Sequence, residues 1–481
     1  MGLCPTCSCW VPLRQVLRLA LPTMGMYLLL MGTETVSLVI LGRIPGSSAH
    51  EVAGMGLGNL VYNVAALAVG FGFTSSQDTL VTQAAGRGDV ELCLLYLNRC
   101  QLWMFVIFVA SGSIVAFTQP FLSLLHVTDM ATAEHCGTYT RLMVLGLLGT
   151  FQYSALRKFL MAQKDAMAGL FVQAVTVPMH VLWCTWLVPQ HRIAGVGIAM
   201  AIKGWCDFFL LGVYVSWLRP RPAYRGWWCF WRALYGDRVR EGMKEYFKLA
   251  VPGVVMTAAE WWSFELLGLF AGYLHSAPKL AAHVTATNIA SILYLAGTGA
   301  QKATSTLVGA AVGSGNQEEV RSYIRTALGW NFGLGVFQAV LVTVLAELLA
   351  KIYSPGNSSV QTLLITLLPI VGCQSVLDGL NQVLQGALYA FGLQAKASKV
   401  SVFCYWLVLP IASFLLCFTV GLGVSGLWLG SMIACVVALG LNAQIYLTAR
   451  FTSASQTAQI RMNLDTDCVN DTRSKAEVMA A

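Results

Sequence analysis

The chain alternates long apolar stretches with short polar connections, and this alternation is its dominant pattern. An α-helix needs about 20 consecutive, mostly apolar residues to cross the hydrocarbon core of a bilayer. Stretches of at least that length lie at about residues 16–42, 52–76, 101–126, 137–162, 166–190, 194–217, 247–274, 280–312, 327–353, 360–392, 398–421 and 424–449. The pattern therefore predicts an all-α, polytopic membrane protein of about twelve transmembrane helices.

The second half of the chain repeats the first. Residues 79–89 (TLVTQAAGRGD) return in related form at residues 306–316 (TLVGAAVGSGN), and each copy ends the second helix of its half. An Ala-Leu-Pro at Pro22 and an Ala-Val-Pro at Pro252 open the two halves. Six helices, an even number, keep both copies in the same orientation, as in transporters built from parallel repeats. We expect two pseudo-symmetric six-helix bundles.

Polar segments divide the chain into five parts. The predicted organisation is a cytoplasmic N-terminus at 1–15, an N-terminal six-helix lobe at 16–217, a basic cytoplasmic linker at 218–246, a C-terminal six-helix lobe at 247–450 and a cytoplasmic tail at 451–481. The tail is polar and mixed in charge, which is a composition typical of disorder.

Composition and charge support a membrane protein and its orientation. Of the 481 residues 57% are hydrophobic and 11% charged, whereas soluble domains carry about 25% charged residues. The net charge of +8 comes from Lys and Arg in the linker and in alternate connections, so the positive-inside rule places these segments and both termini in the cytoplasm. The sequon at Asn357 then falls in an outside loop. This explanation of the positive net charge does not require a nucleic-acid partner.

No cofactor or metal is expected, because none of the 14 cysteines forms a zinc pattern with histidine. The first residues match the loose myristoylation pattern at Gly2, with Cys4, Cys7 and Cys9 as candidates for palmitoylation. A protein with about twelve spans needs no such anchor.

Two carboxylic acids, Glu260 and Glu265, lie within the span at 247–274. Each costs about 2.5–3.5 kcal/mol at membrane depth on insertion scales, so intramembrane acids usually serve a function. On a helix of 100° per residue the two side chains point about 140° apart, which excludes a tight pair. A buried acid can hold a proton in one state and accept a cation in another. The alternative is a permanently protonated, hydrogen-bonded Glu.

Other polar and aromatic groups extend this candidate site. Asp378 shares a helical stripe with Gln382 and Gln385. Ring faces attract cations, amides bond substrates, and both also serve as packing groups and interhelical bonds. The candidates of these kinds are Trp261, Trp262, Tyr273, Tyr294, Tyr405, Trp406, Gln83 and Asn288. Lys203 and Asp207, four residues apart on one helix, are expected to neutralise each other.

Several motifs, taken in order, resemble the multidrug and toxic compound extrusion (MATE) family, eukaryotic members above all. They are Glu-Trp-Trp-Ser-Phe-Glu at 260–265, Gln-Ala-Ala-Gly at 83–86, Asp378 with Gln-Gly at 385–386, Gly-Leu-Gln at 392–394, Tyr-Trp at 405–406, Leu-Pro at 409–410 and Gly-Leu-Trp-Leu-Gly at 426–430. The resemblance covers nearly all of residues 15–450.

The resemblance implies two six-helix bundles that move by alternating access and export organic cations or amphipathic compounds. It assigns Glu260 as the essential carboxylate of the seventh helix and Glu265 as a second one. Asp378 falls where animal members have a Glu, and Asn63 and Asp78 match a recurring Asn and acid in and after the second helix.

The sequence also departs from the family pattern. The first-helix Asp of archaeal members would align with Ser37, an eighth-helix Glu of animal members with Asn288, and Leu307 and Tyr389 stand where Arg is common. Glu34, an acid in the first helix, has no family counterpart.

The sequence thus predicts a secondary active antiporter, not an enzyme, since no concentrated His/Asp/Ser set lies near one face. It would exchange organic cations or other amphipathic small molecules for protons. Sodium coupling, and a flippase of lipid-linked or amphipathic substrates, are the alternatives. We expect the protein to function as a monomer in the lipid bilayer of the plasma membrane or of a vacuolar or vesicular membrane.

Overall fold

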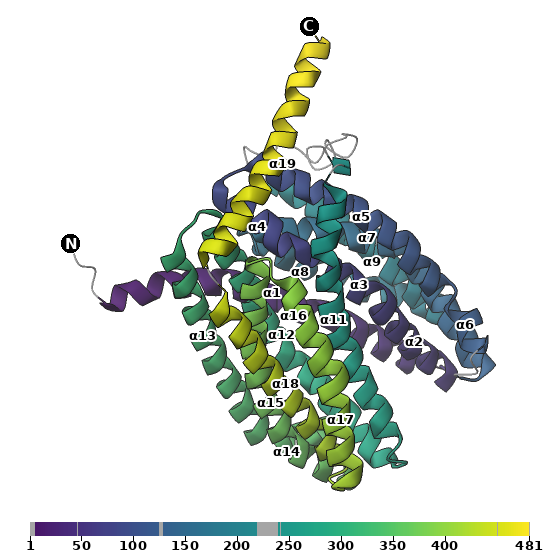
Figure 1. The fold of residues 1–481 in the computed structure, drawn as a ribbon. Helices are drawn as coiled ribbons and strands as arrows, with labels where there is room; N and C mark the ends of the chain where they lie inside the picture. Colours follow the sequence, from purple (N-terminus) through teal and green to yellow (C-terminus); the bar gives the residue numbers. More distant parts are fainter. Residues whose placement is uncertain are drawn as a thin grey trace. The chain divides into compact units, whose positions relative to one another are not determined.

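The computed structural model describes residues 5–45, 47–124, 128–218, 239–240, 242–449 and 451–480, with the backbone alone for residues 5–9 and 467–480. Every regular element among these residues is helical (Figure 1). Most of the predicted basic linker and the lipidation candidates Gly2 and Cys4 lie outside the described residues, as do the side chains of Cys7 and Cys9.

Eleven helical segments of the described chain are long and apolar enough to cross a membrane. The predicted span at 137–162 is the exception, although it lies within a helix of 33 residues, α7 (Met130–Ala162). This helix is less apolar than the others and carries Glu134, Arg141, Arg157 and Lys158. Length and hydropathy therefore identify all but one of the predicted spans.

The chain divides into two compact units. The N-unit comprises Gly25–Val254 and Ile460–Ala481, and the C-unit comprises Val255–Gln459 and Met1–Met24. The boundaries fall inside three helices, α1 (Pro5–Arg43), α11 (Met243–Gly272) and α19 (Phe451–Ala480). Each unit thus takes a short piece from the opposite end of the chain.

The N-unit contains the second part of α1 and the helices that follow it. These are α2 (Ala49–Tyr62), η1 (Asn63–Leu67), α3 (Ala68–Phe73), η2 (Thr74–Ser76), α4 (Gln77–Arg87), α5 (Val90–Ala116), α6 (Thr118–Leu124), α7, α8 (Met167–His191), α9 (Ile193–Val213) and η3 (Tyr214–Leu218). Glycines bring α7 and α9 close together: a Cβ on Gly149 would lie 2.8 Å from the carbonyl oxygen of Gly204. Small residues at such crossings are typical of membrane helices.

The C-unit follows the same order of elements. It contains most of α11, then α12 (Ala277–Gly313), α13 (Gln317–Val344), α14 (Ala346–Tyr353), α15 (Ser358–Ala390), α16 (Gln394–Phe403), η5 (Cys404–Val408), α17 (Leu409–Phe414), η6 (Leu415–Thr419) and α18 (Val424–Thr448). The series long, short, long of α5, α6 and α7 recurs as α13, α14 and α15. A Cβ on Gly297 of α12 would lie 3.1 Å from the Cα of Gly379 on α15, so these two helices also cross closely.

The repeated sequence motif forms the same turn in both units. Gly88 and Gly315 have φ angles of +80° and +76°, a left-handed conformation that glycine adopts without steric cost and that commonly ends a helix. The next residues start the following helices: Asp89 accepts the backbone N–H of Leu92 at 3.0 Å, and Asn316 accepts that of Glu319 at 3.2 Å. The motif is thus a helix end joined to a helix start.

The C-terminal tail is a helix rather than a disordered segment. Ala458 and Met462, four residues apart on one face of α19, are buried. Asp465 accepts hydrogen bonds from Arg99 at 2.9 Å and from Tyr96 at 2.7 Å, both residues of α5. The prediction of disorder was wrong because it weighed average polarity, whereas the buried Met462 and the Asp465 carboxylate hold the part of this helix that begins at Ile460 within the N-unit.

Candidate functional site

Glu260 lies in the middle of α11 and is buried, with 5% of its surface exposed. Tyr294 and Lys302 of α12 and Asp378 and Gln385 of α15 surround it closely enough to act on its charge. Its Oε1 atom has no hydrogen-bond partner among the described residues. Buried polar atoms are nearly always hydrogen-bonded, so an orphaned one marks a position that a proton, ion or ligand can fill.

Asp378 is the second buried acid of the C-unit. Its Oδ1 accepts a hydrogen bond from the thiol of Cys435 on α18, with an S–O distance of 3.6 Å. Tyr405 of η5 also lies near both acids, and its buried hydroxyl has no partner within the described chain. We call Glu260, Asp378, Tyr294, Tyr405 and Cys435 the acid cluster. Five elements, α11, α12, α15, η5 and α18, contribute one residue each.

Hydrogen bonds of the Gln382 and Gln385 side chains, next to the acid cluster, join α15 to α12. Thr298 donates to Gln382 at 3.0 Å, and Gln301 donates to the side-chain oxygen of Gln385 at 2.9 Å. The Gln382 amide in turn donates to the backbone carbonyl of Tyr294 at 3.4 Å. Both glutamines therefore act as interhelical bonds, the second use that the sequence suggested for them, and they position the helices that carry Tyr294 and Asp378.

Two buried acids of the N-unit, Asp78 and Asp207, have lysine partners, unlike those of the acid cluster. Asp78 of α4 accepts from Lys158 of α7 at 2.9 Å. Asp207 and Lys203 of α9 are 2.8 Å apart, as their spacing predicts, and Lys203 also donates to Gln173 of α8 at 2.8 Å. A buried carboxylate held in this way is neutralised within the protein.

Glu34 of α1 is an N-unit acid without a lysine or arginine partner among the described ion pairs. It is half-buried and hydrogen-bonds the side chain of Asn63, the first residue of η1. Ser37, one turn further along α1, lies 2.8 Å from Nε2 of His180. No described basic residue forms an ion pair with Glu34, so this acid and Asn63 make a small polar site of their own.

Comparison with known proteins fits this arrangement of two repeated bundles. The model of the MatE family matches residues 22–186 and 252–415, one match within each predicted lobe. The chain belongs to the MATE family.

Curated relatives and solved structures agree with this assignment. The MATE chain is 27% identical over 470 residues to "Multidrug and toxin extrusion protein 1" of Oryctolagus cuniculus, covering 96% of this chain and 79% of the relative. It is 24% identical to "Protein DETOXIFICATION 37" of Arabidopsis thaliana, covering 87% and 82%. The crystal structure of the eukaryotic MATE transporter AtDTX14 superimposes with a TM-score of 0.86 at 20% identity, over 94% of this chain and 99% of that one.

This MATE protein is therefore a multi-pass integral membrane transporter with the two-bundle fold, and not an enzyme.

The structure brings together only part of the predicted site. Glu260, Asp378, Tyr294, Tyr405 and Gln382 meet in the C-unit. Glu265 and Asn288 are exposed on the surface, and Trp262 packs edge-on against Trp406 at 6.4 Å beside the partly buried Trp261. The remaining candidates Gln83, Asn63, Asp78 and Glu34 belong to the N-unit.

Sequence reasoning missed two residues at this site. Cys435 lies in an apolar helix, where a cysteine is normally a small packing residue, so nothing marked it. Lys302 did carry a signal, because it is a basic residue inside the predicted span at 280–312 and such residues are rare. Its ammonium group lies 5.4 Å from the ring centroid of Tyr389.

Proposed function

We propose that this MATE transporter exports organic cations or other amphipathic compounds in exchange for protons, with Glu260 as the coupling acid. The observation that carries the proposal is the orphaned carboxylate oxygen of Glu260 beside a second buried acid, Asp378. Two buried carboxylates that act on each other's charge repel when both are ionised, so we expect the pair to hold a proton when no cation is bound.

Loss of that proton would create a net negative site lined by the rings of Tyr294 and Tyr405. Such a site attracts a desolvated cation, through charge and through about 0.5–2 kcal/mol from each ring face. A proton would compete with the substrate for the same charge. Exchange then follows from a single binding site that opens to one side of the membrane at a time, the alternating access expected for this fold.

Sodium is the rival coupling ion, because two adjacent carboxylates also suit a hard cation. Few neutral oxygens near the two acids are free to bind sodium. The side-chain oxygen of Gln385 already accepts a hydrogen bond from Gln301, which leaves the Tyr405 hydroxyl as a neutral oxygen of the acid cluster without a described partner. A proton needs one good hydrogen-bond acceptor, whereas a sodium ion needs several oxygens at once. Proton coupling therefore requires less rearrangement of this site.

Transport of a fluorescent organic cation into proteoliposomes tests the proposal. We expect uptake to follow an imposed pH gradient, acidic on the side that receives the substrate, and to persist when sodium is replaced by an inert cation. Uptake that requires sodium at a constant pH gradient would show that sodium, and not the proton, is the coupling ion. No uptake under either gradient, from protein that remains folded, would overturn the proposed substrate class.

The orientation is proposed on the distribution of charge. Arg240 and Lys244 belong to the predicted cytoplasmic linker, whereas Asn357 lies exposed before α15, where its side-chain oxygen caps the helix by accepting from Val360 at 3.2 Å. The Asn357 amide nitrogen is left for a glycan. A mass shift on removal of N-glycans, lost in Asn357→Gln, would place this loop outside and both termini in the cytoplasm.

A further inference from the structure

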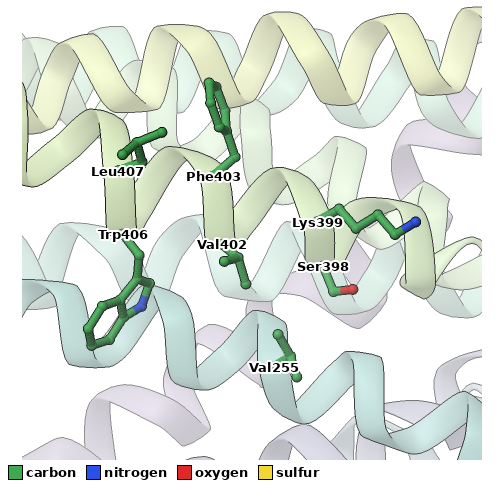
Figure 2. A pocket seen from close by; sticks show the side chains of 7 residues that line it. All are labelled: Val255, Ser398, Lys399, Val402, Phe403, Trp406 and Leu407. Atoms are coloured by element: carbon green, nitrogen blue, oxygen red, sulfur yellow. The ribbon is translucent and has the colours of Figure 1, made fainter.

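An open groove runs along the surface of the C-unit. It has a volume of about 560 Å³ and lies between α11 and the continuous helix formed by α16 and η5. Figure 2 shows Ser398, Val402 and Trp406, spaced four residues apart, on the side of this helix that faces Val255 of α11. A helical stripe therefore forms one wall of the groove.

The two ends of the groove differ in chemistry. Lys399 and Ser398 lie at one end, and Trp406 and Leu407 lie at the other (Figure 2). Lys399 is exposed and forms no ion pair with any described residue. All other lining residues are apolar. The groove therefore offers one cation at the head of a hydrophobic strip, which is complementary to an amphipathic anion.

The apolar wall is open along its whole length. Val402, Trp406 and Leu407 are 43%, 46% and 49% exposed. A water-soluble ligand lying here would leave much of its own apolar surface uncovered. A membrane lipid in the same place would leave no apolar surface in water, because the side of its chain that faces away from the groove stays in the bilayer.

The dimensions also match a lipid. Lys399 and Leu407 are eight positions apart, or about 12 Å along a helix, close to the about 15 Å of one leaflet's hydrocarbon. The positive-inside rule puts Lys399 near the cytoplasmic surface, the leaflet rich in anionic lipids. Residues Cys404–Val408 form a π-helical turn, a distortion that is frequent at functional sites.

We propose that this groove is a binding site for an anionic phospholipid of the surrounding membrane. The phosphate would be held by the ammonium group of Lys399 and the acyl chain by Val402, Trp406 and Val255. None of the residues that line the groove belongs to the acid cluster, so lipid binding can be measured without a transport assay.

Lipid binding is measured by native mass spectrometry of the full-length protein. The probes are phosphatidylserine and phosphatidylcholine with identical acyl chains. Lys399→Gln is expected to weaken binding of phosphatidylserine about fivefold, the effect of one basic residue at a membrane surface, and to weaken phosphatidylcholine less, because the choline group already neutralises the charge of its phosphate. Lys399→Arg should retain binding, and Trp406→Ala should weaken both lipids equally because it removes a contact with the chain.

Lys396 provides the matched control, since it is exposed on the same helix one turn earlier and does not line the groove. Lys396→Gln should leave both lipids bound. Equal loss of phosphatidylserine in Lys396→Gln and Lys399→Gln would show general attraction by a basic surface and overturn the site. Unchanged binding in Lys399→Gln or in Trp406→Ala would overturn it as well.

Discussion

Buried carboxylic acids are treated in opposite ways in the two units. In the N-unit, Asp78 and Asp207 are each within 2.9 Å of a lysine ammonium group. In the C-unit, Glu260 and Asp378 lie beside each other, and neither forms an ion pair with another described residue. The two units share one order of helices, so the fold alone does not determine whether a membrane-depth acid is neutralised.

The difference teaches where a transporter can keep a titratable charge. An acid with a lysine partner is stable as an ion pair and has little reason to change protonation. Glu260 and Asp378 form no ion pair with a described residue, and apart from the field of Lys302 their neighbours are each other, a thiol and two phenols, so we expect a proton or a cation from outside to balance their charge. Under the proposed function the C-unit therefore holds the exchangeable site, whereas Asp78 and Asp207 of the N-unit form ion pairs. Glu34 lies between the two cases because it has Asn63 but no described basic partner.

The largest effect is expected from Glu260→Gln. The substitution keeps the shape of the protonated acid, so the folded yield should hold, but it removes the exchangeable charge, and gradient-driven uptake should fall to the level of empty vesicles. Glu265→Gln is the matched control, an exposed acid on the same helix, and should retain uptake. Uptake by Glu260→Gln against a gradient would place the coupling acid elsewhere.

Lys203→Met tests the opposite prediction for the N-unit. Removing one partner of a buried pair leaves an uncompensated charge and costs about 3–5 kcal/mol, so the melting temperature and the folded yield should drop sharply. The double variant Lys203→Met with Asp207→Leu should recover most of the stability, because both charges are gone. If the single variant melts normally but loses transport, the pair is functional and the comparison fails.

Asp378→Asn is expected to weaken transport without abolishing it. The amide oxygen can still accept from Cys435, so folding should change little, while the site loses the second acid that repels the ionised form of Glu260. Uptake rates and melting curves of the same preparations separate the two effects. A parallel loss of folded protein and uptake would instead make Asp378 a structural residue.

Cys435→Ala sharpens the role of the thiol next to Asp378. A single hydrogen bond contributes about 0.5–1.5 kcal/mol, so we expect a small fall in melting temperature and a severalfold reduction in uptake at most. Cys417→Ala, a buried cysteine of η6 that is not in the acid cluster, serves as the control. Loss as complete as in Glu260→Gln would make Cys435 a principal residue of the site.

The smallest effect concerns an exposed acid outside the membrane-spanning segments. Asp129 caps α7 by accepting the backbone N–H of Thr132 at 2.9 Å and its hydroxyl at 2.8 Å, which lowers the pKa of Asp129 to about 2. Its contribution to stability is therefore present above its ordinary pKa of about 4 and disappears as the pH falls towards 2. The difference in melting temperature between wild type and Asp129→Ala should be small at pH 7 and shrink at pH 3.

An Asp129→Ala difference that grows as the pH falls would contradict the cap. The exposed His50 nitrogen, 3.1 Å from Asp129, adds attraction only when the histidine is protonated. His50→Gln therefore separates this contact from the cap itself.

Interactions within one helix were predictable. The sequence indicated that Lys203 pairs with Asp207, that Glu260 and Glu265 point apart, and that the repeated motif is a helix end; the structure confirms all three. Interactions between helices were not. Asp78 and Lys158 are eighty positions apart, Cys435 lies in a helix with no polar neighbour in sequence to mark it, and Asp465 meets Arg99 from the far end of the chain.

The sequence by itself determined which segments are helical and apolar, their duplication and the acids that they carry, because hydropathy and helical period are local properties. Only the tertiary structure decided that Asp78 meets a lysine of another helix and that Glu260 meets Asp378. That outcome depends on how each helix is rotated about its axis, and the rotation is set by close crossings such as those at Gly149 and Gly297. The contacts at these crossings join residues far apart in the chain, so no local pattern encodes them.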